Sequence, residues 1–183
     1  MRVVDPFLAE WPDVDLDVTT AFQFGGLDAL LGHDIDVLVT PDPIERPNLE
    51  YRPVFDYELV LAVAADHPLA QKGHASPEDL TGETLVTYPI ALERLDIYTR
   101  CLVPSGAIPR RHQTGETTDL MLRLVASGRA VSATPDWLVQ EAAGVARVQI
   151  GEGIDKSIHL GLRRGERPEY LNGLIDLAAA TAF

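Results

Sequence analysis

One short apolar run constrains the fold of this chain more than any other feature. Within residues 55–70, FDYELVLAVAADHPLA, the segment Glu58–Ala64 is an almost unbroken series of Val, Leu and Ala. A run of this length predicts a strand buried on both faces, as in parallel or mixed sheets. A buried helix segment is the alternative, but the run is short and Pro68 follows closely. Because one α/β pattern precedes it and a second follows, we interpret this strand as a crossing point between two halves.

Composition limits the classes of function. The 183 residues suffice for one domain or two small lobes, and a hydrophobic content of 46% allows a sizeable core. The net charge of −13 disfavours direct binding to DNA, since non-specific DNA affinity depends on Lys and Arg. Cys101 is the single cysteine, so an internal disulfide is excluded, which fits a reducing cytoplasm. We expect its side chain to have a packing role. The N-terminus lacks the apolar segment of a signal peptide, and no apolar run reaches membrane-spanning length, so no membrane partner is expected.

The first half alternates helical and extended patterns. Apolar spacing predicts two helices and period-2 alternation predicts a half-buried strand, with Pro and Gly marking the turns between them. The predicted elements are the end of a helix over Val3–Glu10, a strand over Val14–Val18, a short helix containing Leu27, Leu30 and Leu31, a strand over Ile35–Val39 and a strand over Leu49–Phe55.

The second half repeats the alternation. Ser76-Pro77-Glu78-Asp79 is a helix start, with Ser at the N-cap, Pro at the first helical position and an acid at the third. The elements expected after it are a strand over Thr84–Thr87, a helix over Leu92–Leu102, a weak strand over Arg110–Thr114, a helix over Thr117–Ser127 with Leu120, Leu124 and Val125 inward, a strand over Ala130–Ala133, a helix over Asp136–Ala143, strands over Val145–Ile150 and Ser157–Leu162, and a helix from Pro168.

This order predicts an α/β protein of two lobes. Mixed sheets with helices on both faces follow from the alternation of strands and helices. The strand near Ile158 is suited to cross back, which gives a two-strand hinge. We expect lobe I to contain residues 1–62 and 161–183, and lobe II residues 63–160. A ligand is then expected in the cleft between the lobes, at the carboxyl ends of the strands.

Four phrases in order resemble a known family. WPDVDLDV, LLGHDIDVLVT, LVLAVAADHPLA and PEDLTGETLVTYP are similar to the effector-binding domain of LysR-type transcriptional regulators, and the resemblance covers essentially the whole chain. It implies a type II periplasmic-binding-protein-like fold, a cytoplasmic location, a homodimer and a small-molecule effector. Full members carry an N-terminal winged helix-turn-helix, which this sequence lacks, so DNA is expected as a partner only through that missing domain. The family also has a strand before the first helix, which is missing here.

A narrower resemblance implies the effector. TAFQ, VFDYELVLAV and ETLVTYP followed by RLD are similar to the members that regulate methionine biosynthesis. This subgroup implies homocysteine, or a related amino acid, as the ligand.

Polar loops after predicted strands supply the candidate ligand-binding residues. Hydroxyl groups and helix N-terminal amides together attract carboxylates. Glu116 would accept the effector's ammonium group, and Phe22 would line a pocket for an apolar or thiol tail. Each residue taken alone is also explained as a helix cap, a core residue or a solvated side chain. The predicted set is Thr20, Phe22, Gln23, Thr40, Pro41, Tyr88, Glu116, Thr117 and Thr134.

Catalytic and metal sites are not predicted. The five histidines share no metal-ligand spacing, and the sequence contains no nucleophile elbow, P-loop or dinucleotide-binding glycine motif. We therefore expect no cofactor and no enzymatic activity. Two alternatives stay open on the same fold: a solute-binding protein of a transport system, which would need export, and an enzyme such as a dehydratase or deaminase, which would need an acid, base or cofactor residue in the cleft.

Overall fold

The computed structural model describes residues 3–165 and 167–180. The chain divides into two compact units. Unit 1 contains the residues up to Asp56 and those from Ser157 onward, and unit 2 is the continuous segment Tyr57–Lys156. Both division points fall a few residues before the lobe boundaries expected at 62/63 and 160/161. They lie within two strands, β2 (Leu49–Ala64) and β8 (Asp155–Arg163), so each of these strands passes from one unit into the other. The mixed α/β architecture with a two-strand connection is therefore confirmed.

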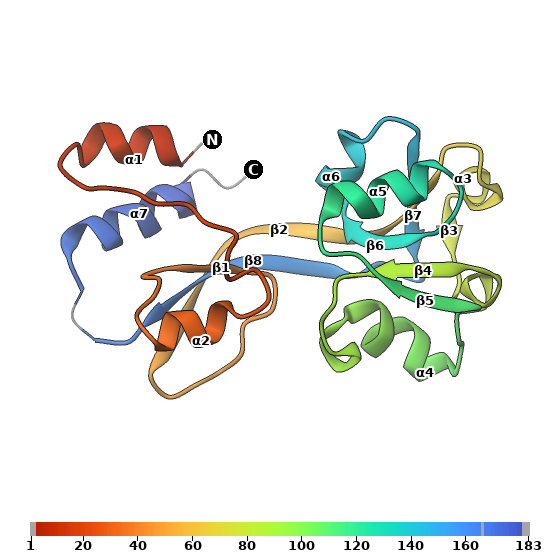
Figure 1. The fold of residues 1–183 in the computed structure, drawn as a ribbon, viewed down its shortest axis with the longest axis horizontal. Coiled ribbons are helices and arrows are strands. Elements are labelled where there is room, and N and C mark those ends of the chain that lie inside the picture. The colour runs from red at the N-terminus through yellow and green to blue at the C-terminus, as the bar shows by residue number, and fades with distance from the viewer. Residues whose placement is uncertain (1–2, 166, 181–183) are drawn as a thin grey trace. The chain divides into compact units, whose positions relative to one another are not determined.

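The remaining elements follow the predicted order closely (Figure 1). They are α1 (Val4–Glu10), α2 (Gly26–Leu31), β1 (Leu38–Thr40), α3 (Pro68–Lys72), β3 (His74–Ala75), the 3-10 helix Pro77–Gly82, β4 (Thr84–Thr87), the 3-10 helix Leu92–Arg94, the π-helix Ile97–Leu102, α4 (Val103–Ser105), β5 (Arg111–Thr114), α5 (Thr118–Ala126), β6 (Ser132–Pro135), α6 (Asp136–Gln140), β7 (Val145–Ile150) and α7 (Glu169–Ala180).

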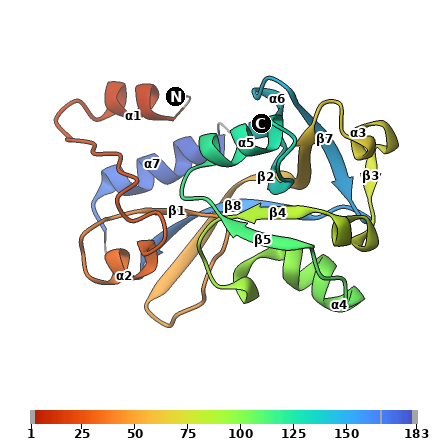
Figure 2. The same cartoon turned by 45° about the vertical axis from the view of Figure 1, so that its right-hand side comes forward.

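Unit 1 is built on the order β1-β8-β2. β1 pairs antiparallel with β8, with Thr40 opposite His159. Helices α1 and α7 lie together on one side of these strands and α2 lies on the other side (Figures 1 and 2). The core contains side chains from both ends of the chain, including Phe7, Leu30 and Leu162, each at most 1% exposed. Unit 1 is therefore held together by segments that are distant in sequence.

Unit 2 contains a mixed sheet. β2 pairs antiparallel with β6 and β7, and β7 pairs parallel with β3. β4 and β5 run parallel, and Val131 joins β4 to the rest by accepting from the Val86 N–H and donating to the Thr84 carbonyl, both at 2.9 Å. Val60, Val86 and Met121 are fully buried and belong to one core cluster beneath α5. The run that dominates the sequence thus becomes the central strand, buried on both faces.

The predicted helix start at Ser76 is confirmed, but a 3-10 helix follows it. The Asp79 carboxylate accepts hydrogen bonds from the Ser76 N–H at 2.7 Å and from the Lys72 ammonium at 2.5 Å, and Pro77 occupies the first helical position. Asp79 therefore satisfies one of the N–H groups that every helix start leaves open.

Three local predictions were wrong. Val14–Val18 alternates in polarity but forms no strand. A strand needs a neighbouring strand to pair with, and no described segment pairs with these residues. Val18 is accordingly 64% exposed. Leu92–Leu102 is a 3-10 turn followed by a π-helix instead of one α-helix. Leu120 is 49% exposed and Met121 is fully buried, so the inward face of α5 contains Met121 together with the predicted Val125, four residues further on, and Leu124 is partly buried at its edge.

Several boundaries also moved. The strand predicted over Ile35–Val39 begins only at Leu38, the strand predicted over Ala130–Ala133 runs from Ser132 to Pro135, and the helix predicted over Asp136–Ala143 ends at Gln140. Such shifts at element ends are the expected weakness of reading a pattern from local sequence.

Candidate ligand-binding site

The carboxyl ends of β4 and β5 meet in unit 2. Thr87 is in register with Thr114, and the Gly115 N–H donates to the Thr87 carbonyl at 2.9 Å. A Cβ atom on Gly115 would lie 2.6 Å from the Met121 Cγ, so only glycine lets this turn pack directly on α5. The turn therefore places the residues before α5 next to the residue that follows β4.

Tyr88 follows β4 and reaches the first turn of α5. Its hydroxyl is hydrogen-bonded to the hydroxyl of Thr118. Thr117 is the N-cap, and its Oγ1 accepts from the Leu120 N–H at 3.3 Å. Because Thr117 is occupied by capping, Thr118 and not Thr117 supports Tyr88. Glu116, in the same turn, is exposed.

Thr134 lies fully buried on β6, and its Oγ1 has no hydrogen-bond partner within the described residues. It is in register with Val60 on β2, and directly opposed antiparallel residues share a face of the sheet. Val60 belongs to the cluster that Met121 joins and against which Tyr88 packs. An unpaired buried hydroxyl is rare and costs free energy, so a group that arrives with a ligand would be a favourable partner.

Tyr57 adds a phenol that stays protonated. Its ring packs edge-to-face on Trp137, with 4.9 Å between ring centroids. Burial raises the pKa of Tyr57 well above its ordinary value, and the nearby Asp96 carboxylate and Tyr88 raise it further. The hydroxyl of Tyr57 is therefore a hydrogen-bond donor throughout the physiological pH range.

Thr87 and His112 form a second polar pair in unit 2. The Thr87 Oγ1 lies 2.8 Å from the His112 Nε2 and also donates to the Tyr88 carbonyl at 3.1 Å. The imidazole packs edge-to-face on Tyr98, and burial lowers the pKa of His112. This pair fixes the end of β4 from which Tyr88 extends.

In unit 1, the residues from Thr20 to Gln23 form the turn that precedes α2. The Gln23 N–H donates to the Thr20 carbonyl at 3.0 Å, and Thr19 Oγ1 accepts from the Ala21 N–H at 3.1 Å. The side chains of Thr20 and Gln23 are exposed, whereas Phe22 is half-buried. Two polar groups and one aromatic ring are thus presented by a single turn.

Thr40 ends β1 and is 8% exposed. Its Oγ1 accepts from the Asp42 N–H at 3.1 Å, which is a local turn contact around the exposed Pro41. The residue opposite is His159, whose buried Nδ1 has no hydrogen-bond partner in the described part of the chain. The hydroxyl predicted to bind a ligand therefore already stabilises its own turn.

The predicted site residues thus fall into two groups. Tyr88, Glu116, Thr117 and Thr134 come from unit 2, and Thr20, Phe22, Gln23, Thr40 and Pro41 come from unit 1. The predicted set does not include Tyr57, Thr87 or Thr118, although Thr118 ends the polar loop from Thr114 that is itself a candidate ligand-binding segment. The pair of threonines at 117–118 could have indicated Thr118. The side chain of an N-cap residue folds back on its own helix, so the hydroxyl of the next residue is the one available for other contacts. Nothing local indicates Tyr57.

Two features are absent from the described residues. No group of three or more His, Cys, Asp or Glu side chains among them is placed to hold a metal ion. No helix within residues 3–165 and 167–180 is long and apolar enough to cross a membrane.

Comparison with known proteins decides the family. The LysR substrate-binding domain family matches residues 1–182. The chain is a LysR substrate-binding domain. As such it is similar to the transcriptional regulator MetR of Escherichia coli K12, with 36% identity over 167 residues, and to MetR of Haemophilus influenzae, with 30% identity over 188 residues. These alignments cover 90% and 100% of this chain but 52% and 60% of the relatives, so this LysR domain spans little more than half the length of the regulators it matches.

Solved structures agree with this assignment. The regulatory domain of MetR from N. meningitidis is 32% identical and superposes with a TM-score of 0.80, covering 97% of this LysR domain and 84% of that chain. The Synechocystis PCC6803 CcmR regulatory domain, solved in complex with 2-PG, gives a TM-score of 0.81 at 20% identity, with 100% of this chain and 92% of that chain covered. The second similarity shows the fold alone. Together these findings confirm the type II periplasmic-binding-protein-like fold and the MetR-like character of this LysR domain.

Proposed function

We propose that this domain senses a small amino acid, homocysteine or a close relative, on behalf of a LysR-type regulator. The likeness to MetR proteins supports the choice of ligand class. In this proposal the domain acts as a cytoplasmic homodimer, and DNA is bound by another part of a longer protein. The domain is then a sensor and not an enzyme, in keeping with relatives that are named as regulators.

The observation that carries the binding proposal is the unpaired hydroxyl of Thr134. A ligand amide, carboxylate or ammonium group that reached this Oγ1 would pair with it and remove the cost of leaving it unsatisfied. Thr118 and Tyr88 supply hydroxyls on the same side, and the first turn of α5 adds N–H groups that favour a carboxylate. Glu116 is exposed in the turn before α5 and is suited to accept an ammonium group.

Unit 1 contributes a separate group to the proposal. Within unit 1, Thr20 and Gln23 would offer polar atoms to a small amino acid, and Phe22 would pack against a thiol or apolar tail, with Thr40 and Pro41 contributing from the turn after β1. Gln23→Ala tests this group independently of unit 2, because Gln23 is exposed and its removal leaves the core intact.

The experiment is a thermal-shift and calorimetric titration with homocysteine, methionine and O-acetylhomoserine. A ligand that binds only the folded form raises Tm by mass action, by an amount that grows with its concentration. We expect the response to homocysteine to be lost in Thr118→Val. Thr99→Val is the matched control, since Thr99 is exposed and its hydroxyl only contacts the Leu95 carbonyl at 3.4 Å.

The outcomes are distinct. A shift with homocysteine that persists in Thr99→Val and disappears in Thr118→Val supports both the ligand class and the unit 2 group. No shift with any of the three amino acids at millimolar concentration would contradict the ligand class while leaving the family assignment untouched. Release of a chemically altered product during the titration would instead favour the enzyme alternative.

A further inference from the structure

A cavity of about 370 Å³ lies within unit 1, apart from both groups of predicted site residues. It is formed where the end of α2, the end of β8 and the start of α7 come together, and Leu31, Leu162 and Leu171 supply apolar walls. Its volume falls in the lower part of the range of about 300–1,000 Å³ that small-molecule pockets occupy. The cavity is therefore large enough for a small metabolite.

The charge of its lining is unusual for this protein. The whole chain has a net charge of −13, yet Arg163, Arg164 and Arg167 all line the cavity. Asp36 is the one carboxylate among the described residues that line it. The local charge is thus positive within a strongly acidic chain, and such a reversal concentrates anions at the site.

Two of these arginines are occupied by structural contacts. Arg163 donates to the Leu30 carbonyl at 2.7 Å, to the Ile35 carbonyl at 2.6 Å and to the Asp36 carboxylate at 2.8 Å, and so closes the end of α2. Arg167 is hydrogen-bonded to Glu50, and this contact is the main reason that the pKa of Glu50 lies below its usual value. Arg163 and Arg167 shape the cavity.

Arg164 is held differently. Its Nε donates to the Leu49 carbonyl at 2.7 Å, and its main-chain N–H donates to the Asn48 carbonyl at 2.8 Å. Its two Nη groups make no hydrogen bond within the described part of the chain, and the residue is exposed. A guanidinium anchored through Nε has its remaining N–H groups fixed in direction, which is the arrangement that binds carboxylate or phosphate oxygens in a bidentate manner.

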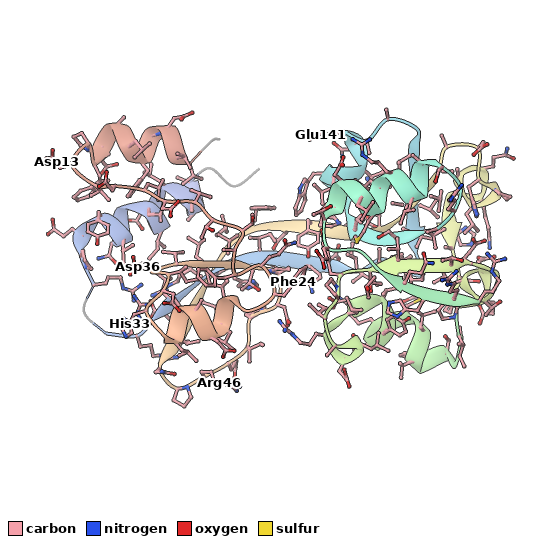
Figure 3. All side chains as sticks on the ribbon, viewed as in Figure 1. Asp13, Phe24, His33, Asp36, Arg46 and Glu141 are labelled. Atoms are coloured by element: carbon pink, nitrogen blue, oxygen red, sulfur yellow. The ribbon has the colours of Figure 1, made fainter. Side chains whose placement is uncertain are left out.

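His33 lies beside this cavity in a conformation that normally requires glycine. Its φ of 66° makes it the one non-glycine residue with positive φ among the described residues. Figure 3 labels His33 and Asp36, which lie close to the end of β8. The imidazole of His33 lines the cavity and makes no hydrogen bond to the described chain. A residue retained in a strained conformation at a pocket wall is a functional candidate.

We propose that this cavity binds a small anion, the carboxylate or phosphate group of a metabolite, through the Nη groups of Arg164 and the imidazole of His33. The positive end of the α7 dipole, at the helix turn that contains Tyr170, adds to the attraction. The apolar walls would contact the carbon skeleton of a carboxylate ligand. This site does not depend on the proposed amino-acid effector, because its lining shares no residue with either group described above.

The first test uses the unmodified domain without any amino acid present. Inorganic phosphate and succinate are titrated in separate arms and followed by ¹H–¹⁵N NMR, with sodium chloride at matched ionic strength as the reference. We expect saturable shifts at the amides of His33, Arg164 and Tyr170. Saturation by phosphate identifies a phosphate ligand, and saturation by succinate alone identifies a carboxylate ligand. Shifts that equal those of sodium chloride, or that spread over the surface without saturating, would overturn the proposal.

The second test is Arg164→Gln, with Arg46→Gln as the matched control. Arg46 is an exposed arginine of unit 1 that does not line the cavity, and the two variants change the net charge equally (Figure 3). We expect Arg164→Gln to weaken binding of the saturating anion at least about tenfold, while Arg46→Gln changes it less than about twofold. Equal weakening in both variants would reduce the effect to net charge and refute a built site. The NMR result on the unmodified domain decides the matter if Arg164→Gln does not fold.

Discussion

Replacing Thr134 by valine should make the free domain more stable and make its ligand bind less tightly. The Oγ1 of Thr134 is buried without a hydrogen-bond partner among the described residues. Leaving a hydroxyl buried and unsatisfied costs about 1–3 kcal/mol, and valine has nearly the same shape without that cost. We expect the free energy of unfolding to rise by about 1–2 kcal/mol. At about 2–4 °C per kcal/mol for a chain of this size, Tm increases by about 2–8 °C.

The matched control is Thr87→Val on β4, in the two-stranded sheet of the same unit. Thr87 is equally buried, at 3% exposed, but its hydroxyl is paired with the His112 Nε2 and the Tyr88 carbonyl. The same chemical change there removes two contacts and leaves the imidazole nitrogen unpaired. We expect a loss of about 1–2 kcal/mol, the opposite sign from Thr134→Val. Urea unfolding with an unchanged m-value would show that the native states alone differ.

Ligand binding provides the second half of the test. One neutral hydrogen bond contributes about 0.5–1.5 kcal/mol, so homocysteine affinity should fall roughly two- to tenfold in Thr134→Val, measured by calorimetry. A destabilised Thr134→Val would show that the hydroxyl has a partner in the folded free protein, and the reasoning would be wrong. A stabilised variant with unchanged affinity would show that the ligand does not contact this hydroxyl.

Three further outcomes are expected. An alkaline titration monitored by tyrosinate absorbance should show a late phase that disappears in Tyr57→Phe. Because folding raises the pKa of Tyr57, the stabilisation that its protonated phenol provides is complete below about pH 10 and is lost as pH rises further. Asp79→Asn should reduce the loss of stability that the protein shows on acidification. The hydrogen bond from Lys72 lowers the pKa of Asp79, so the stabilisation that the carboxylate provides, below about 1 kcal/mol, is lost as pH falls through the acidic range beneath pH 4. An unchanged loss of stability below pH 4 would contradict this. Gly115→Ala should cost about 1–3 kcal/mol in urea unfolding, because its Cβ would lie 2.6 Å from the Met121 Cγ, and a neutral effect would show that the turn can move aside.

The central strand was predictable because its signal is local. A run of apolar residues that ends in turn residues needs no knowledge of its partners, and β2 is buried over Val60–Val63 as that run implies. Val14–Val18 failed for the converse reason. Alternation shows that a segment could pair, but pairing depends on residues far along the chain.

The candidate site shows the same limit at the level of single atoms. Sequence position correctly placed Tyr88 and Thr117 at the ends of β4 and α5, since strand ends and N-caps have local signatures. It could not show that Thr118, and not Thr117, contacts Tyr88. It also could not show that Thr134 is unpaired, because hydrogen-bond satisfaction is a property of the assembled core.

The interrupted course of unit 1 has a consequence for synthesis on the ribosome. Unit 2 is one continuous segment and contains its own core, so it can fold as soon as Lys156 has left the exit tunnel. The residues up to Asp56 are made first but complete their core only when β8 and α7 arrive. At about 5–20 residues per second, they wait on the order of 10 s with an incomplete core. During that interval the apolar surfaces of α1 and α2 are open to chaperones, and slow synthesis of the segment that begins at Ser157 would prolong this vulnerable state.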